Sequence, residues 1–137
     1  MSNIFYDRKW SKSTCISPFR CWVAGWGKDS VDGQFQLIQN KVDIPLMSSR
    51  ECGPKLEQAL GRDAGRNFRL SPSEICAGGE QNKDACDGDG GAPLVCESKE
   101  GRWNVVGIVT WGVDCGLKGV PGVYANIHHM LDFILNA

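Results

Sequence analysis

Residues 84–96 read DACDGDGGAPLVC, an acidic and glycine-rich stretch that ends in a short apolar run. As a calcium loop starting at Asp87, it would place Ala92 at the turn glycine and Ser98 where a bidentate glutamate belongs. As a phosphate-binding loop it lacks the G-x-x-x-x-G-K-[ST] string, and no helix start follows its glycines. A glycine-rich turn between two strands is acceptable. The stretch therefore predicts a turn in a β-rich domain rather than a calcium or nucleotide site.

Short apolar segments around this stretch predict further strands. They are punctuated by glycine and read CWVAGWG (21–27), FQLIQNKVDI (35–44), APLVC (92–96), WNVVGIVTW (103–111) and GVYANI (122–127). In the second segment, the positions expected to point inward are Phe35, Leu37, Val42 and Ile44. The sequence contains no strand–helix–strand alternation and no internal repeat. The pattern predicts an all-β fold with antiparallel strands.

Two helices are predicted beside these strands. Ser48 and Glu51 have capping-box spacing, but a helix starting there would contain Pro54 at a cost of about 3 kcal/mol. We therefore expect a short helix from Pro54 to Gly61, followed by an exposed loop over residues 61–72. An apolar stripe near the C-terminus predicts one amphipathic helix that packs on the β domain. Its positions are Ile127, Met130, Leu131, Ile134 and Leu135.

Length, composition and charge limit the classes of protein to which the chain can belong. Its 137 residues suit one domain, and 42% hydrophobic with 23% charged residues is typical of a globular protein. Lys and Arg number 15 against 16 Asp and Glu, without a basic run, so neither nucleic acid nor a membrane is an expected partner. The longest apolar run, around residues 105–111, is far short of the roughly 20 residues that span a bilayer.

The first residues and the cysteines indicate where the protein is found. Residues 1–20 are aperiodic and lack the pattern of an export signal, so we interpret them as a poorly ordered lead-in to a domain over residues 21–137. No two of the seven cysteines have the C-x-x-C spacing of common zinc and thiol-redox motifs, so disulfides are predicted without a chosen connectivity. Disulfides favour an oxidising compartment. We expect an extracellular, secreted protein whose export signal lies outside this sequence.

Several motifs occur together in one order along the chain. CWVAGWGK (21–28), ICAGG (75–79), DACDGDGGAPLVC (84–96), GIVTWG (107–112) and PGVY (121–124) are similar, in order and spacing, to motifs of the chymotrypsin/trypsin family of serine proteases. The resemblance covers residues 21–137 and implies the second Greek-key β-barrel of that family with its closing α-helix. The first barrel, which supplies the catalytic histidine and aspartate, is not in this sequence.

The resemblance also implies a disulfide framework. The implied pairs are Cys21–Cys96, Cys52–Cys76 and Cys86–Cys115. Cys15 is left unpaired by this scheme. It either bonds to sequence outside this chain or stays a free or intermolecularly paired thiol.

Gly90 determines what the resemblance implies about catalysis. Active relatives have the string G-D-S-G-G-P, whereas residues 88–93 read GDGGAP, so glycine replaces the nucleophilic serine. No hydroxyl is left to attack a substrate. The backbone N–H groups of Gly88 and Gly90 match the oxyanion-hole donors, which glycine retains. His128 and His129 do not match the catalytic histidine, and we interpret them as structural or surface residues rather than metal ligands.

Three further residues resemble parts of a trypsin-type specificity pocket. Asp84 matches the carboxylate at the pocket base, and Gly112 and Gly122 match glycines that leave room for a lysine or arginine side chain. The alternative is that Asp84 is an ordinary loop carboxylate. Asp89 matches the residue that pairs with the new amino terminus when a zymogen is cleaved, and that terminus is not in this sequence.

The motif combination is most similar to non-catalytic clip-domain serine protease homologues of arthropods. Such homologues act as cofactors of extracellular cascades such as prophenoloxidase activation in innate immunity. The resemblance therefore predicts an inactive protease homologue, without metal or cofactor, whose partners are proteases or zymogens. The alternative is a trypsin-like serine endopeptidase whose chain is truncated here. A third possibility is a truncated product without a stable fold, because a lone second barrel exposes the face that packs on the first.

Overall fold

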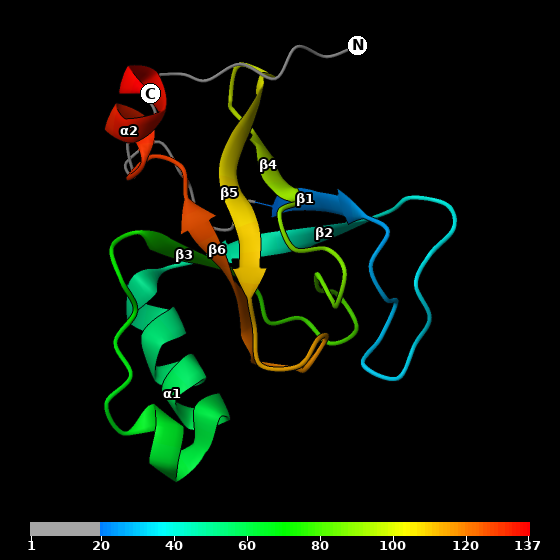
Figure 1. The fold of residues 1–137 in the computed structure, drawn as a ribbon, viewed down its shortest axis with the longest axis vertical. Coiled ribbons are helices and arrows are strands. Elements are labelled where there is room, and N and C mark those ends of the chain that lie inside the picture. The colour runs from blue at the N-terminus through cyan, green and yellow to red at the C-terminus, as the bar shows by residue number, and fades with distance from the viewer. Residues whose placement is uncertain (1–19) are drawn as a thin grey trace.

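The computed structural model describes residues 20–137, which form a closed β-barrel with two helices (Figure 1). The strands are β1 (Arg20–Gly25), β2 (Asn40–Met47), β3 (Glu74–Gly78), β4 (Pro93–Glu97), β5 (Trp103–Trp111) and β6 (Pro121–Asn126). Their order around the barrel is β1-β2-β3-β6-β5-β4, and every neighbouring pair is antiparallel. Because β4 lies beside β1, the first four strands form a Greek key. The predicted fold class is confirmed.

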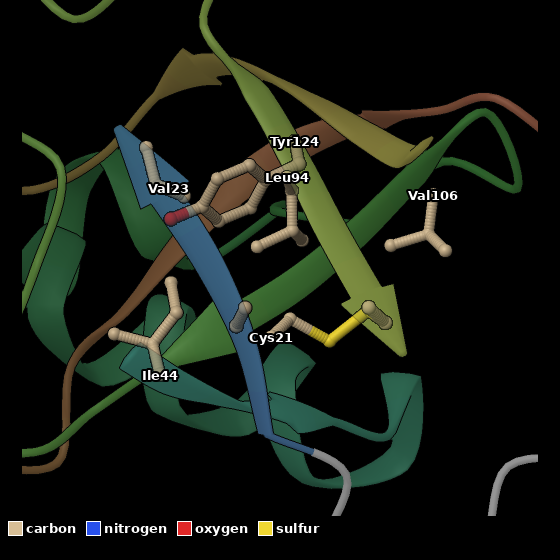
Figure 2. Close-up of a cluster of buried hydrophobic side chains, with 8 residues drawn as sticks. Cys21, Val23, Ile44, Leu94, Val106 and Tyr124 are labelled. Atoms are coloured by element: carbon tan, nitrogen blue, oxygen red, sulfur yellow. A yellow bond between two sulfur atoms is a disulfide. The ribbon is translucent and has the colours of Figure 1, made fainter. Parts of the chain in front are cut away.

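The barrel interior holds the main hydrophobic core. Alternate residues of each strand point inward, so Val23, Ile44, Leu94 and Tyr124 are almost fully buried together with Val106 (Figure 2). The strands β1 and β4 are also joined covalently, because Cys21 lies opposite Cys96 in their register and bonds to it. The other disulfides join Cys52 to Cys76 and Cys86 to Cys115. These are the three pairs that the resemblance implied, whereas Cys15 and the lead-in residues 1–19 lie outside the described residues.

Helix α1 (Ser49–Gly65) starts earlier than predicted. The Ser48 hydroxyl accepts a 3.3 Å hydrogen bond from the Glu51 N–H and donates a 3.0 Å bond to the Glu51 carboxylate. Ser48 therefore caps the helix, its hydroxyl also bonds the Glu51 side chain, and Pro54 lies inside the helix. The predicted start at Pro54 is wrong, because the cap and the buried Cys52–Cys76 disulfide hold the first turn in place.

Gly61 interrupts α1 with a positive φ of 80° and an extended ψ, so the helix bends where its end was predicted and resumes for one further turn. The prediction of an exposed loop over residues 61–72 holds only in part. Gly65 is buried against the backbone of Glu57, and the ring of Phe68 meets Trp111 edge-on at 5.9 Å between centroids. These contacts extend a second core cluster below the barrel, formed by Cys52, Leu56, Cys76 and Val123.

The segment between β1 and β2 is a projecting loop (Figure 1), not the start of a strand. Phe35 is 62% exposed and Leu37 is 98% exposed, so the prediction that both point inward is wrong. Their alternation matches a strand, but β2 begins only at Asn40 because no neighbouring strand pairs with residues 36–39. Val42 and Ile44, by contrast, belong to β2 and pack in the core.

Helix α2 (Leu131–Asn136) ends the chain at the opposite end of the barrel from α1 (Figure 1). None of its residues is buried, and Phe133, Ile134 and Leu135 are exposed. The prediction of a C-terminal helix is confirmed, but its expected burial on the β domain is wrong, because the helix has only six residues. Across residues 20–137, no helix is long and apolar enough to cross a membrane.

Candidate functional site

Five of the residues singled out by the sequence border one cavity of about 460 Å³. Asp84, Gly88 and Gly90 come from the long connection between β3 and β4, Gly112 follows β5, and Gly122 lies in β6. The Greek-key topology brings these segments together at one end of the barrel. Such a volume is typical of a site for a side chain or a small ligand.

Asp84 lies deep in this cavity. The backbone N–H of Gly116 donates a 3.1 Å hydrogen bond to its Oδ2. Burial raises the pKa of the Asp84 carboxyl to about 6, and backbone hydrogen bonds from Gly116 and Ala85 partly oppose the increase. The Cys86–Cys115 disulfide ties the segment that carries Asp84 to the segment that carries Gly116. Asp84 is thus a partly desolvated carboxylate that accepts hydrogen bonds from backbone N–H groups.

Gly122 and Gly112 keep the space in front of Asp84 open. A Cβ at Gly122 would lie 3.2 Å from Asp84 Oδ1 and 3.4 Å from the hydroxyl oxygen of Tyr124. A Cβ at Gly112 would lie 3.5 Å from the carbonyl oxygen of Asp114. Any larger residue at either position would therefore narrow the way to the carboxylate.

The Tyr124 hydroxyl is a buried group that sequence reasoning missed. Tyr124 is 1% exposed, lines the cavity, and its hydroxyl has no hydrogen-bond partner within residues 20–137. Burial and then the charges of Asp84 and Asp89 raise the pKa of this phenol. The tyrosine stands in the motif PGVY, but only the fold reveals that its hydroxyl lies beside Asp84.

Gly88 and Gly90 also line the cavity, and each has a backbone N–H group. The Asp87 carbonyl accepts a 2.8 Å hydrogen bond from the Lys28 N–H. Because the trans peptide is planar, the N–H of Gly88 points away from Lys28. Gly88 has a φ of 95°, a conformation that suits glycine. Within residues 20–137, neither the Gly88 N–H nor the Gly90 N–H donates to another group.

Asp89 does not line this cavity, although it lies next to Gly90 in sequence. Its Oδ1 accepts a 2.8 Å hydrogen bond from the Gly27 N–H, and its Oδ2 accepts a 3.0 Å bond from the Cys86 N–H. Asp89 instead lines a second cavity of about 260 Å³, and Asp84 lines both cavities.

A network of ion pairs, also missed from the sequence, anchors the segment that leads to Asp84. Arg20 bonds Asp43 at 2.7 Å and Glu80 at 2.8 Å, and Lys83 bonds Asp43 at 2.9 Å. The hydrogen bonds from Lys83 and Arg20 lower the pKa of Asp43, and the bond from Arg20 lowers the pKa of Glu80. No sequence pattern indicates this network, because its members are far apart in the chain.

The two histidines lie away from the cavity. His128 and His129 are exposed in the turn before α2, which agrees with their interpretation as surface residues. No group of three or more histidine, cysteine or acidic side chains among residues 20–137 could hold a metal ion. The residues that line the cavity include three aspartates, Asp84, Asp87 and Asp114, together with Gly88 and Gly90.

A closed Greek-key barrel with an acidic, glycine-lined cavity is typical of trypsin-like proteins. The sequence model of the trypsin family matches residues 9–134, and the chain belongs to this family. An Aedes aegypti protein, "Inactive CLIP domain-containing serine protease A3", is 49% identical over 116 residues, which cover 83% of this chain and 24% of the relative. "Phenoloxidase-activating factor 2" of Galleria mellonella is 42% identical over 119 residues, covering 84% of this chain and 38% of the relative.

The chain is also similar to a vertebrate protein. Coagulation factor XI of Bos taurus is 41% identical over 117 residues, which cover 84% of this chain and 17% of the relative. The chain thus spans well under half the length of each of these three relatives. It is a serine protease homologue related to clip-domain proteins, and these relatives include proteins named inactive and proteins named for phenoloxidase activation.

Proposed function

We propose that the chain is a catalytically inactive protease homologue that binds a lysine or arginine side chain of a partner protein. The single observation that supports this function is that Gly90, which by resemblance matches the position of the nucleophilic serine, lines the same cavity as Asp84. A cation that enters the cavity meets the Asp84 carboxylate, whose burial strengthens the attraction. Without a hydroxyl at this position the protein cannot form a covalent intermediate, so we infer that it binds the partner without cleaving it.

The partners that we propose are proteases or zymogens of an extracellular cascade of the prophenoloxidase type. The name of the Galleria mellonella relative, a phenoloxidase-activating factor, supports this setting. Three disulfides within residues 20–137 support secretion, because such bonds persist in oxidising compartments. In this role the protein docks on a partner through an exposed basic residue and does not cleave it.

A binding measurement tests the pocket. Fluorescent p-aminobenzamidine, whose amidinium resembles an arginine side chain, is titrated into the full chain. We expect saturable binding that Asp84→Asn weakens at least about tenfold, because a desolvated charge pair is lost. The matched control is Asp114→Asn, since Asp114 borders the same cavity. Equal affinity of the wild type and Asp84→Asn would contradict the proposal.

An activity measurement tests the loss of catalysis. A chromogenic peptide that ends in arginine is offered to the full chain before and after treatment with an activating protease. We expect no hydrolysis and no covalent labelling by a fluorophosphonate probe, because Gly90 has no hydroxyl. Turnover or labelling by the purified protein would instead support the alternative, a trypsin-like endopeptidase.

A further inference from the structure

The last turn of α1 lies at the end of the helix that points away from the barrel (Figure 1). Gly61 has non-helical φ and ψ values, so a single turn follows the break, and Arg66 caps it. Arg66 and Asn67 are both exposed, and the segment 63–67 reads DAGRN. Exposed tips of small and polar residues are the preferred sites of proteolytic cleavage.

This end of α1 is also weakly anchored. Of residues 57–67, only Gly65 is buried, and it packs against the backbone of Glu57. Segments with few buried side chains open locally at a small part of the free energy of global unfolding. Such an opening exposes the backbone around Arg66 to an endoprotease.

Two arginines close to Arg66 in sequence are poorer cleavage sites. The bond after Arg62 is followed by Asp63, whose negative charge opposes the oxyanion that forms during peptide hydrolysis. Arg69 stands between Phe68 and Leu70, and both of these side chains pack against the second core cluster. The backbone on each side of Arg69 is therefore held in place.

Basic residues elsewhere lie in backbone that is better held. Lys41 belongs to β2, which is paired on both sides. Two backbone hydrogen bonds of 2.7 and 2.9 Å close the turn that contains Lys99 and Arg102. The amide after Lys118 donates a 2.8 Å hydrogen bond to the Gly79 carbonyl. The bond after residue 66 thus combines exposure with weak anchoring.

The residues that follow Arg66 are linked to the main cavity. The Phe68 ring meets Trp111 edge-on at 5.9 Å between centroids, and Trp111 lines the cavity. The Phe68 N–H donates a 3.0 Å hydrogen bond to the Gly65 carbonyl. A cut after Arg66 puts these two partners on different sides of the break and makes Phe68 the second residue of a new amino terminus. The first residues of a chain are poorly ordered unless they are tied down.

We propose that the peptide bond between Arg66 and Asn67 is a cleavage site for an endoprotease that cleaves after arginine, and that cleavage releases Phe68 from Trp111 at the cavity wall. Water adds across the bond, so that Arg66 ends in a carboxylate and Asn67 begins with an ammonium group. The inference goes beyond the proposed function, and only its effect on ligand binding rests on that function.

Limited proteolysis of the full chain with trypsin, with the disulfides intact, tests the site. Cys21–Cys96 and Cys52–Cys76 join the two sides of the cut, so the protein stays one molecule until it is reduced. After reduction, mass spectrometry should detect a fragment that begins at Asn67 before the product of any other cut within residues 20–137. A first cut at another bond within that range overturns the cleavage site.

Two variants assign the cut to one residue. Arg66→Gln should lack the fragment that begins at Asn67, because trypsin requires a basic side chain before the bond. Arg62→Gln, at the same exposed end of α1, is the matched control and should keep it. Both side chains are exposed, so both variants should unfold at the same temperature as the wild type. Loss of the fragment in both variants overturns the assignment to Arg66.

The release of Phe68 is measured separately by near-UV circular dichroism, which reports the packing of aromatic rings. We expect cleavage to reduce the aromatic signal of the purified chain as Phe68→Ala does without cleavage. Cleavage of the Phe68→Ala variant should add no further change. An unchanged spectrum after cleavage of the wild type overturns the release.

Titration of p-aminobenzamidine into the purified cleaved chain measures the effect on the cavity. We expect cleavage to weaken binding at least about threefold, because the wall at Trp111 is in place for only part of the time. Equal affinity of the cleaved and uncleaved chains overturns this effect. No binding to either chain contradicts the proposed function, whereas the proteolysis and the spectra still decide the inference.

Discussion

The backbone N–H of Gly27 donates a 2.8 Å hydrogen bond to Oδ1 of Asp89, although the two residues lie 62 positions apart. The bond fastens the loop between β1 and β2 to the turn that presents Gly88 and Gly90. Phe35 of the same loop lies against Gly88, and the Lys28 N–H orients the Asp87 carbonyl. The free amides of the cavity are therefore positioned by a loop that does not itself supply them.

Replacing Asp89 by asparagine tests how much its hydrogen bonds contribute to the stability of the fold. The amide group of Asp89→Asn puts an N–H where the carboxylate accepted one, so a backbone donor loses its partner. We expect the free energy of unfolding to fall by about 1–3 kcal/mol, measured by urea titration with the disulfides intact. Asp32→Asn, on the exposed loop, is the control. Equal stability of the two variants would show that Asp89 has no structural role.

The space around Gly27 gives a second prediction. A Cβ at Gly27 would lie 2.5 Å from the Asp89 carboxyl, whereas a Cβ at Gly53 meets nothing within 4 Å. We expect Gly27→Ala to lower the free energy of unfolding by about 1–3 kcal/mol. Gly53→Ala should change it by less than about 1 kcal/mol, because the gain in helix propensity is opposed by the adjacent Pro54. An equal loss of stability in both variants in thermal unfolding would contradict this steric account.

Local patterns predicted the antiparallel strands, whereas the resemblance carried by short motifs predicted the barrel and the residues of a pocket. The glycines and Asp84 occur in three such motifs, and the topology places them around one space. The loop between β1 and β2 could not be predicted in the same way. Phe35 and Leu37 alternate as in a strand, but Phe35 forms only an isolated bridge with Lys28 and both side chains are exposed.

The start of α1 shows a related limit. The cost of Pro54 was estimated from the helix alone, whereas the observed start also depends on the disulfide from Cys52 to β3 and on the buried Leu56. Tertiary contacts of this kind commonly override a local preference. The pairing of Arg20 with Asp43 and Glu80 likewise follows from the barrel order and not from sequence spacing.

The ion-pair network predicts a dependence of stability on pH. Asp43 and Glu80 have lowered pKa values in the folded protein, so their ionised forms stabilise it above the unfolded pKa of about 4. That contribution is lost as the pH falls through the lowered folded values. We expect Arg20→Gln to have a lower Tm than the wild type at pH 7. In strong acid, we expect the two proteins to have the same Tm. Arg62→Gln, on exposed α1, is the control, and a deficit independent of pH would contradict the assignment.

Asp84 gives the opposite dependence, since its folded pKa of about 6 lies above the unfolded value of about 3.9. Between these values the folded protein binds more protons, so this group reduces stability as the pH rises from about 4 to 6. Asp84→Asn should therefore stabilise the protein above pH 6 and have less effect near pH 4. Thermal unfolding across this range measures the change, and a stability gain that is constant with pH would contradict it.

The same ionisation controls ligand binding. Only ionised Asp84 attracts a basic side chain, and Tyr124 beside it stays protonated because burial raises its pKa. We expect the affinity for a peptide ending in arginine to be about tenfold lower at pH 5 than at pH 7. The peptide keeps its charges over this range, because its carboxyl and guanidinium groups titrate outside it. If calorimetry gives the same affinity at both pH values, the basic side chain does not contact Asp84.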